Sequence, residues 1–144
     1  MKEKAWWRSR PIAHRGLHNG REVPENSLLA FERAIAAGHP IELDVIVLKD
    51  GTPAVFHDED LLRLTGVLGL TRSLTKAHLK LLRIYGGDQR IPTLKEVCEL
   101  VQGRVPLMIE IKCDKATGRD EAAIVQVLKD YQGEVAIQSF NPYV

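Results

Sequence analysis

Eight side chains that are suited to bind a metal, hold an anion or transfer a proton lie within short apolar segments or directly after them. They are His14, Arg15, Glu42, Asp44, His57, Asp58, Glu110 and Lys112. An isolated charge is costly to bury, so proteins keep charges in apolar segments when the charges are paired or bind a metal. We therefore treat these eight residues as candidates for a functional site.

The three carboxylates at the centre of this set predict a site for a divalent cation. Glu42 and Asp44 are two positions apart in the segment IELDVIVL, so they share one face if this segment is a strand. Glu110 lies in a second strand-like segment, VPLMIEIK. Three converging carboxylates form a site of hard oxygen ligands, which suits Mg²⁺ or Ca²⁺.

The cations and imidazoles supply the other parts that phosphoryl chemistry requires. Arg15 is suited to hold a phosphate with its bidentate guanidinium group, and Lys112 is suited to assist as a point charge. His14 and His57 fit the roles of general base and general acid, because the unperturbed pKa of histidine lies near neutrality. A metal, phosphate-binding cations and proton-transfer groups together favour chemistry at a phosphate.

An interpretation without a metal is also open, in which the carboxylates form ion pairs with the two cations. Glu110 and Lys112, two positions apart, would then be a structural pair. Each histidine would be a strand-end residue that bonds to the backbone.

Asp58 of this set and two polar residues outside it, Glu25 and Asn26, are candidates for a supporting role. We expect Glu25 to orient Arg15 or His14. Asn26 acts either in the site or as the N-cap of the helix that follows it, and Asp58 either supports the preceding histidine or forms a turn.

Strand-like and helix-like segments alternate along the chain, which is typical of βαβ units and a parallel sheet. The expected strands cover residues 11–14, 41–48, 105–112 and 134–140. The expected helices cover residues 26–38, 75–83, 93–103 and 119–133. Thr93 followed by Glu96 predicts a capping box at the start of the third helix. Residues 58–74 are expected to be mostly loop.

The segment 45–56 interrupts this alternation. Asp50-Gly51 is a strong turn signal. The connection from residue 48 to residue 53 is too short for a parallel crossover. We therefore expect a hairpin that rises above the sheet, with 53–56 as a return strand outside the regular parallel order.

The composition excludes several classes of protein. Hydrophobic residues make up 44% and charged residues 27% of the 144 positions, as in a single globular domain. Twenty Lys and Arg against 19 Asp and Glu leave a net charge of +1, without the basic field that nucleic acid attracts. We expect no transmembrane segment and no secretory signal peptide. Cys98 and Cys113 lack metal-ligand spacing, which predicts thiols in a reducing, cytoplasmic location.

Seven motifs resemble, in this order, the signature of the glycerophosphodiester phosphodiesterase family: AHRG, PENS, IELDV, KDGTPAVFHDEDLLRLTG, IPTLKEV, IEIK and IQSF. The resemblance implies an α/β fold, a (β/α)₈ TIM barrel of which this chain holds the first four or five strands. It also implies a small insertion over residues 58–90. A complete barrel takes roughly 250 residues, so residues 1–144 would form a single partial domain.

The resemblance further implies metal-dependent hydrolysis of a glycerophosphodiester to sn-glycerol 3-phosphate and an alcohol. The nucleophile would be either a neighbouring hydroxyl of the substrate or a water molecule. The implied residues are the acid–base pair His14 and His57, the Mg²⁺ or Ca²⁺ ligands Glu42, Asp44 and Glu110, and the phosphate-binding residues Arg15 and Lys112.

Two other functions stay open at this stage. One is a phospholipase-D-like action on lysophospholipids, and the other is a non-catalytic remnant that binds phosphate. An unclosed parallel sheet leaves bare edges, which favour self-association. The expected partners are therefore a small glycerophosphodiester and a further protein surface at the sheet, but no nucleic acid.

Overall fold

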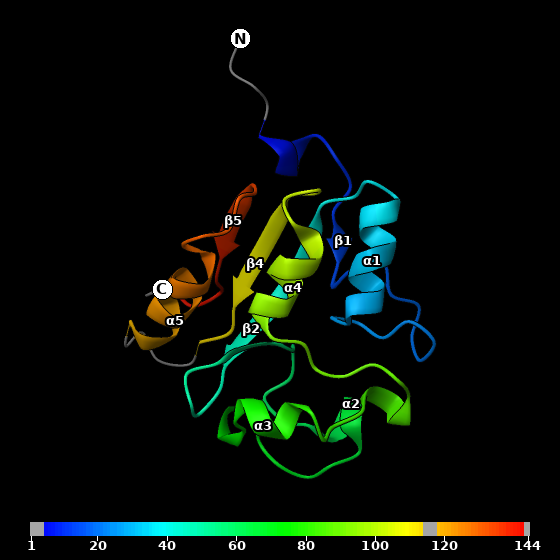
Figure 1. The fold of residues 1–144 in the computed structure, drawn as a ribbon, viewed down its shortest axis with the longest axis vertical. Helices are drawn as coiled ribbons and strands as arrows, with labels where there is room; N and C mark the ends of the chain where they lie inside the picture. Colours follow the sequence, from blue (N-terminus) through cyan, green and yellow to red (C-terminus); the bar gives the residue numbers. More distant parts are fainter. Residues whose placement is uncertain (1–4, 114–117, 143–144) are drawn as a thin grey trace.

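The computed structural model describes residues 5–113 and 118–142, and its centre is a mostly parallel sheet. The parallel strands lie in the order β1 (Ala13–His14), β2 (Ile41–Val47), β4 (Leu107–Ile111) and β5 (Val135–Gln138). Their carboxyl ends share one edge of the sheet, and the short helices α2 (Leu62–Thr65) and α3 (Lys76–Leu79) lie beyond this edge (Figure 1). Ligands of parallel α/β sheets bind at this edge.

Three helices cover one face of the sheet. They are α1 (Leu28–Ala36), α4 (Leu94–Val101) and α5 (Arg119–Leu128), with α4 between the other two (Figure 1). Ser27 caps α1 by accepting a hydrogen bond from the backbone N–H of Ala30. Thr93 and Glu96 form the predicted capping box of α4. These caps satisfy backbone donors that a helix leaves without partners in its first turn.

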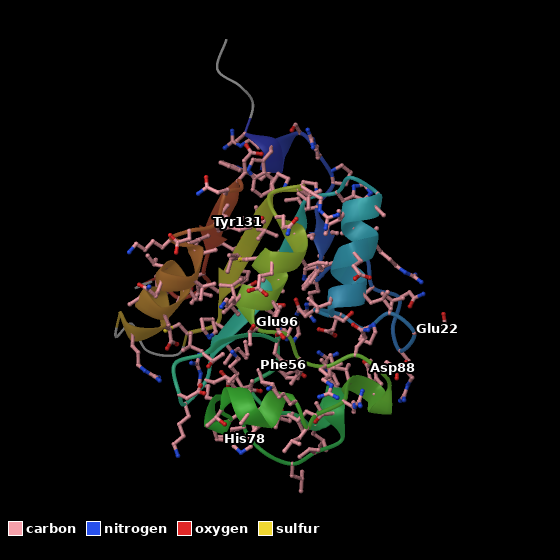
Figure 2. The ribbon with its side chains drawn as sticks, viewed as in Figure 1. Glu22, Phe56, His78, Asp88, Glu96 and Tyr131 are labelled. Carbon is pink, nitrogen blue, oxygen red and sulfur yellow. The ribbon has the colours of Figure 1, made fainter. Side chains whose placement is uncertain are left out.

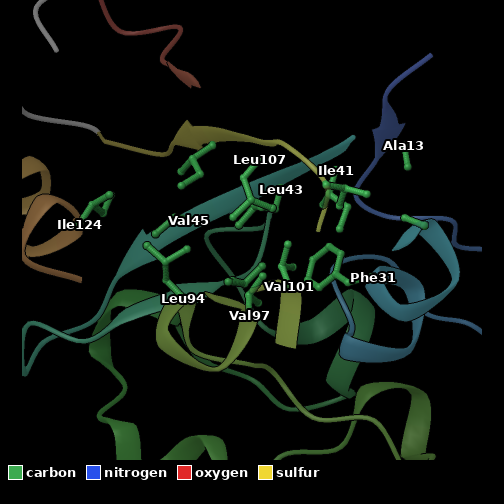
Figure 3. Packing of buried hydrophobic residues seen from close by; sticks show 14 of the residues in the cluster. Ala13, Phe31, Ile41, Leu43, Val45, Leu94, Val97, Val101, Leu107 and Ile124 are labelled. Carbon is green, nitrogen blue, oxygen red and sulfur yellow. The ribbon is translucent and has the colours of Figure 1, made fainter. Parts of the chain in front are cut away.

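The main apolar core lies between these helices and the sheet. Leu43 and Val45 of β2 pack in one cluster with Leu94 and Val97 of α4 and with Leu107 of β4 (Figure 3). Successive side chains of a strand point to opposite faces. The intervening residues of β2, which include its two carboxylates, therefore point to the face without these helices.

A hairpin and a second apolar cluster hold the segment beyond the sheet edge. Strand β3 (Pro53–Val55) pairs antiparallel with the end of β2. Residues 58–90, which we call the cap segment, contain α2, the 3₁₀ turn η2 (Thr71–Ser73), α3 and the 3₁₀ turn η3 (Ile84–Gly86). Phe56 lies between the sheet and the cap segment (Figure 2). The second cluster comprises Ile46, Leu48, Ala54, Phe56, Leu61, Leu64, Leu79, Ile84 and Ile91.

The structure corrects several boundaries that the sequence predicts. Residues 58–74 are mostly loop, as expected, and the short elements α2 and η2 lie within them. The helices predicted over residues 93–103 and 119–133 are observed as α4 and α5. Helix α5 ends at Leu128, before the predicted end at residue 133. Residues 53–55 are a true sheet strand, although they pair antiparallel and lie outside the parallel order, as the short connection requires.

The 3₁₀ turn η1 (Trp6–Arg8) lies at the end of the molecule opposite the cap segment (Figure 1). The sequence expectations for residues 1–4 lie outside the described residues. Across residues 5–113 and 118–142, no helix has the length and apolar character needed to cross a membrane.

Candidate active site

Three buried carboxylates converge on the face of the sheet that points away from α1, α4 and α5. One carboxylate oxygen each from Glu42, Asp44 and Glu110 lies within 4.8 Å of the others. The register of the parallel strands explains the convergence, because Asp44 of β2 is the direct partner of Glu110 of β4. Glu42 precedes Asp44 by two positions and so shares its face.

The Glu42 carboxylate is the strongest indication that this cluster holds a cation. Burial raises its pKa to about 7, and repulsion from Asp44 adds to this effect. Its Oε1 atom is buried without a hydrogen-bond partner among the described residues. A buried oxygen of this kind is costly unless a ligand satisfies it. The donor set of three carboxylates matches the oxygen ligands that Mg²⁺ and Ca²⁺ prefer.

Two cations lie against the same carboxylates. The Nζ atom of Lys112 lies 3.4 Å from Oδ1 of Asp44 and also forms an ion pair with Glu110. The Nε atom of Arg15 lies 3.3 Å from Oδ2 of Asp44. The ion pairs expected in the interpretation without a metal are therefore present, and they coexist with the orphaned oxygen of Glu42.

The loop between β1 and α1 brings Arg15, Glu25 and Asn26 to this cluster, and its backbone has an uncommon conformation at two of them. Arg15 and Asn26 both have positive φ angles, of 56° and 54°. Such backbone is uncommon outside glycine and is often found at functional sites. The strained conformation aims Asn26 at Asp44, to which its Nδ2 donates a hydrogen bond of 3.0 Å. Asn26 is thus a partner of the cluster, while Ser27 caps the helix.

Glu25, for which we expected a role in orienting Arg15 or His14, contacts Arg15. Its Oε2 atom accepts a hydrogen bond of 2.6 Å from Nη1 of Arg15. Burial raises the pKa of Glu25, but hydrogen bonds from Arg63 and Arg15 outweigh burial, so the pKa lies below its usual value. Glu25 therefore presents a charged partner that fixes the direction of the Arg15 guanidinium group.

His57 and Asp58 follow β3 at the edge of the same cluster. The pKa of Asp58 is lowered chiefly by its hydrogen bonds with Arg63, so the carboxylate is ionised and acts only as an acceptor. Its Oδ1 atom lies 2.8 Å from Nδ1 of His57, which must therefore carry the donated proton. This tautomer leaves Nε2 of His57 as the nitrogen that can accept a proton.

A hollow of about 460 Å³ connects His57 with the carboxylate cluster. Its lining includes His57 and Asp58, which follow β3, Glu110 of β4, and Lys112 directly after β4. The hollow places a titratable imidazole, a carboxylate of the cluster and a cation around one space.

His14 reaches the cluster from β1. Its side chain is 67% exposed, and its Nε2 atom lies 3.9 Å from Oε2 of Glu42. The register explains this placement, since His14 is the direct partner of Glu42 across the parallel strands. His14 therefore stands at the open side of the carboxylate cluster, whereas His57 lines the hollow.

A model of the glycerophosphoryl diester phosphodiesterase family matches residues 14–143. The chain belongs to this family. The resemblance that the seven sequence motifs indicate is thereby confirmed.

Several relatives share this assignment. A glycerophosphodiester phosphodiesterase of Caldanaerobacter subterraneus is 41% identical over 143 residues, which cover 92% of this chain and 58% of the relative. One from Bacillus altitudinis is 38% identical over 90% of this chain and 57% of the relative. A human lysophospholipase D is 35% identical over 78% of this chain and 39% of the relative. The chain thus spans less than two thirds of the length of these relatives.

Solved structures of the family confirm the fold. An Oleispira antarctica phosphodiesterase in complex with sn-glycerol-3-phosphate superposes with a TM-score of 0.84 at 33% identity, over 95% of this chain and 60% of that one. A glycerophosphodiester phosphodiesterase of Thermotoga maritima superposes with a TM-score of 0.75 at 37% identity, over 90% and 53% of the two chains. The described strands thus form the first part of a TIM barrel of this family.

Arg63 is the residue of this site that the sequence interpretation missed. It lies on α2 of the cap segment and contacts the carboxylates of both Asp58 and Glu25. Glu25 is far from it in the sequence, so no spacing rule connects the two. The weak signal was that Arg63 lies within the motif KDGTPAVFHDEDLLRLTG, which also contains His57 and Asp58.

Proposed function

We propose that the protein hydrolyses glycerophosphodiesters to sn-glycerol 3-phosphate and an alcohol. The observation that carries this proposal is the convergence of three carboxylates, two cations and two histidines at one edge of the sheet. The family match supports the same class of reaction. A related phosphodiesterase is known with sn-glycerol-3-phosphate bound.

The carboxylate cluster would hold Mg²⁺ or Ca²⁺, which neutralises charge on phosphate oxygens when it is bound. Arg15 would bind the phosphate with its guanidinium fork, and Lys112 would add a second positive charge. Glu25 would keep Arg15 in place, and Asn26 would keep Asp44 in place. These contacts prepare the site before the substrate arrives.

The two histidines would move the protons. One imidazole would take a proton from the nucleophile, and the other would give one to the leaving alkoxide. The Nε2 atom of His57 is suited to this exchange because Asp58 holds the proton on Nδ1. The nucleophile would be a water molecule or a neighbouring hydroxyl of the glycerol moiety, and both present a proton that an imidazole can accept. Attack by the hydroxyl would expel the alcohol and form a cyclic phosphate, which water would then open to sn-glycerol 3-phosphate.

The test is turnover of glycerophosphocholine by the purified chain, followed by ³¹P NMR in Mg²⁺, Ca²⁺ or EDTA. We expect metal-dependent release of sn-glycerol 3-phosphate that stops in EDTA. His14→Ala should lower the rate roughly 10²- to 10⁴-fold, the usual contribution of a proton-transfer group. His18→Ala, a change at an exposed histidine of the loop that follows β1, is the matched control.

A folded chain that turns over nothing with either metal would contradict the proposal. That result would favour the non-catalytic, phosphate-binding alternative, which binding of inorganic phosphate would then support.

A second substrate class is favoured by the surface of the cap segment. Five apolar side chains there are exposed: Leu62, Val67, Leu68, Leu70 and Leu81. An acyl chain of a lysophospholipid would find apolar contacts on this surface. Faster turnover of lysophosphatidylcholine than of glycerophosphocholine, lost in a Leu68→Ser variant, would favour this class over the small diesters.

A cytoplasmic location is part of the same proposal. The Cys98 thiol is not in a disulfide, and burial raises its pKa to about 11. An unreactive, half-buried thiol fits a reducing compartment.

A further inference from the structure

Arg63 joins the two halves of the candidate site. Its Nε and Nη2 atoms donate hydrogen bonds of 2.8 and 3.0 Å to the two carboxylate oxygens of Asp58. Its Nη1 atom donates a hydrogen bond of 2.6 Å to Oε1 of Glu25. One guanidinium group thus holds two carboxylates that come from different loops.

The contact with Asp58 leads to the imidazole of His57. Two parallel hydrogen bonds from Arg63 fix the plane of the Asp58 carboxylate, which is the geometry that a guanidinium fork favours. The oriented Oδ1 atom then accepts the Nδ1 proton of His57. Because the donated proton selects the tautomer, Arg63 acts at a distance on Nε2, the nitrogen that is left to accept a proton.

The contact with Glu25 leads to the phosphate-binding arginine. Glu25 accepts from Arg63 through Oε1 and from Arg15 through Oε2, so the carboxylate bridges the two guanidinium groups. Arg15 reaches Asp44 of the carboxylate cluster with its Nε atom. The chain of contacts therefore extends from α2 of the cap segment to the centre of the site.

We propose that Arg63 is a positioning residue, which fixes His57 through Asp58 and Arg15 through Glu25 at the same time. The cap segment thereby becomes part of the acid–base and phosphate-binding machinery. The inference rests on the proposed function for its catalytic meaning, while the geometric claim stands on the contacts alone. Lysine carries the same charge but lacks the planar fork, so it cannot make all three hydrogen bonds.

The first experiment reads the tautomer of His57 by ¹⁵N NMR in the unmodified full chain and in Arg63→Lys and Arg63→Ala. In the unmodified chain we expect the neutral imidazole to carry its proton on Nδ1. In both variants we expect a mixture in which a large share of the Nε2–H form appears. Arg83→Ala is the matched control, since it removes an exposed arginine of the same segment and should leave the tautomer unchanged.

The second experiment compares kcat and KM for glycerophosphocholine. Loss of position at both His57 and Arg15 predicts that Arg63→Lys lowers kcat and raises KM, with kcat/KM reduced about 10- to 100-fold. Thermal unfolding of the same samples checks that the variants are folded. A folded Arg63→Lys chain that keeps the Nδ1–H tautomer and full kcat/KM would overturn the inference.

The two proposals fail in different ways. If the unmodified chain has no turnover, the proposed function fails, but the tautomer experiment still tests Arg63. If turnover is present and Arg63→Lys changes neither the tautomer nor kcat/KM, the role of Arg63 fails and the proposed function stands.

Discussion

At the scale of a single residue, burial of the Glu42 carboxylate has one unfavourable and one favourable consequence. The carboxylate is buried beside two others, which raises its pKa to about 7. The same crowding creates the oxygen-rich site that a divalent cation requires. The residue therefore weakens the metal-free fold, while it adds an oxygen to a group of carboxylates that could hold a metal ion.

Glu42→Gln should therefore stabilise the metal-free chain and weaken its stabilisation by a divalent metal. Between pH 4.5 and 7 the folded chain binds the Glu42 proton and the unfolded chain does not, so the stability of the metal-free chain should fall as pH rises through this range. The glutamine removes this penalty. At pH 8 and in EDTA, we expect the variant to have a free energy of unfolding higher by on the order of 1–3 kcal/mol.

The measurement is urea unfolding at pH 5 and pH 8, with and without Mg²⁺ or Ca²⁺. Added metal should stabilise the unmodified chain and leave Glu42→Gln nearly unchanged. Equal metal stabilisation of both chains would show that Glu42 is not a ligand.

The residues of the site differ in how far the sequence could predict them. Glu42, Asp44 and Glu110 were predictable because charges stand out in buried strands, where period-two spacing gives the face. The cluster contact of Asn26 was only one of two alternatives, since an asparagine before a helix also fits an N-cap. Arg63 could not be predicted, because its partners come together only when the cap segment folds over the sheet edge.

At the scale of elements, one glycine controls how β1 meets α1. Gly16 has a φ angle of 79°, and a Cβ atom built on it would lie 2.8 Å from the Cβ of Ala30 on α1. The turn that follows His14 and Arg15 therefore packs directly on the helix. This close approach fixes where the loop of the site leaves the sheet.

Gly16→Ala should consequently lower the free energy of unfolding by about 2–4 kcal/mol, from backbone strain and overpacking together. Gly20→Ala is the control, because its φ of 91° carries similar strain but no atom lies within 4 Å of its added Cβ. The control should lose only about 1 kcal/mol. Equal losses in urea unfolding would mean that the contact with Ala30 is unimportant.

The elements were easiest to predict where local chemistry determined them. The capping box at Thr93 and the Asp50-Gly51 turn are local signals, and both lead to the expected elements. Helix α2 escaped prediction because it is only one turn long and ends at Gly66, where the backbone is left-handed. Burial of Leu61 and Leu64 against the hairpin stabilises it, and this tertiary contact has no signature in the sequence.

At the scale of the whole molecule, the edge strand β5 is a candidate surface for association with another chain. Within the described residues β5 pairs only with β4, and Ile137 on it is 49% exposed. Phe140 beyond its end is 87% exposed. An edge strand with exposed apolar side chains favours pairing with another chain.

We therefore predict that the purified chain self-associates in a concentration-dependent way, measured by sedimentation velocity. Ile137→Lys should shift the distribution towards monomer, since a charged residue on an edge strand opposes pairing. Leu81→Lys, which makes the same change at an exposed position of the cap segment, should leave the distribution unchanged. A monomeric unmodified chain at high concentration would contradict the prediction.

The pairing of Asp44 with Glu110 has a consequence for folding itself. A slip of β4 by one residue would set an isoleucine beside Asp44 and turn the glutamate toward the helices. A divalent ion could then find only two of its three protein oxygens. Binding of the ion would thus stabilise the native register of β2 and β4 over the slipped one, although the two strands lie far apart along the chain.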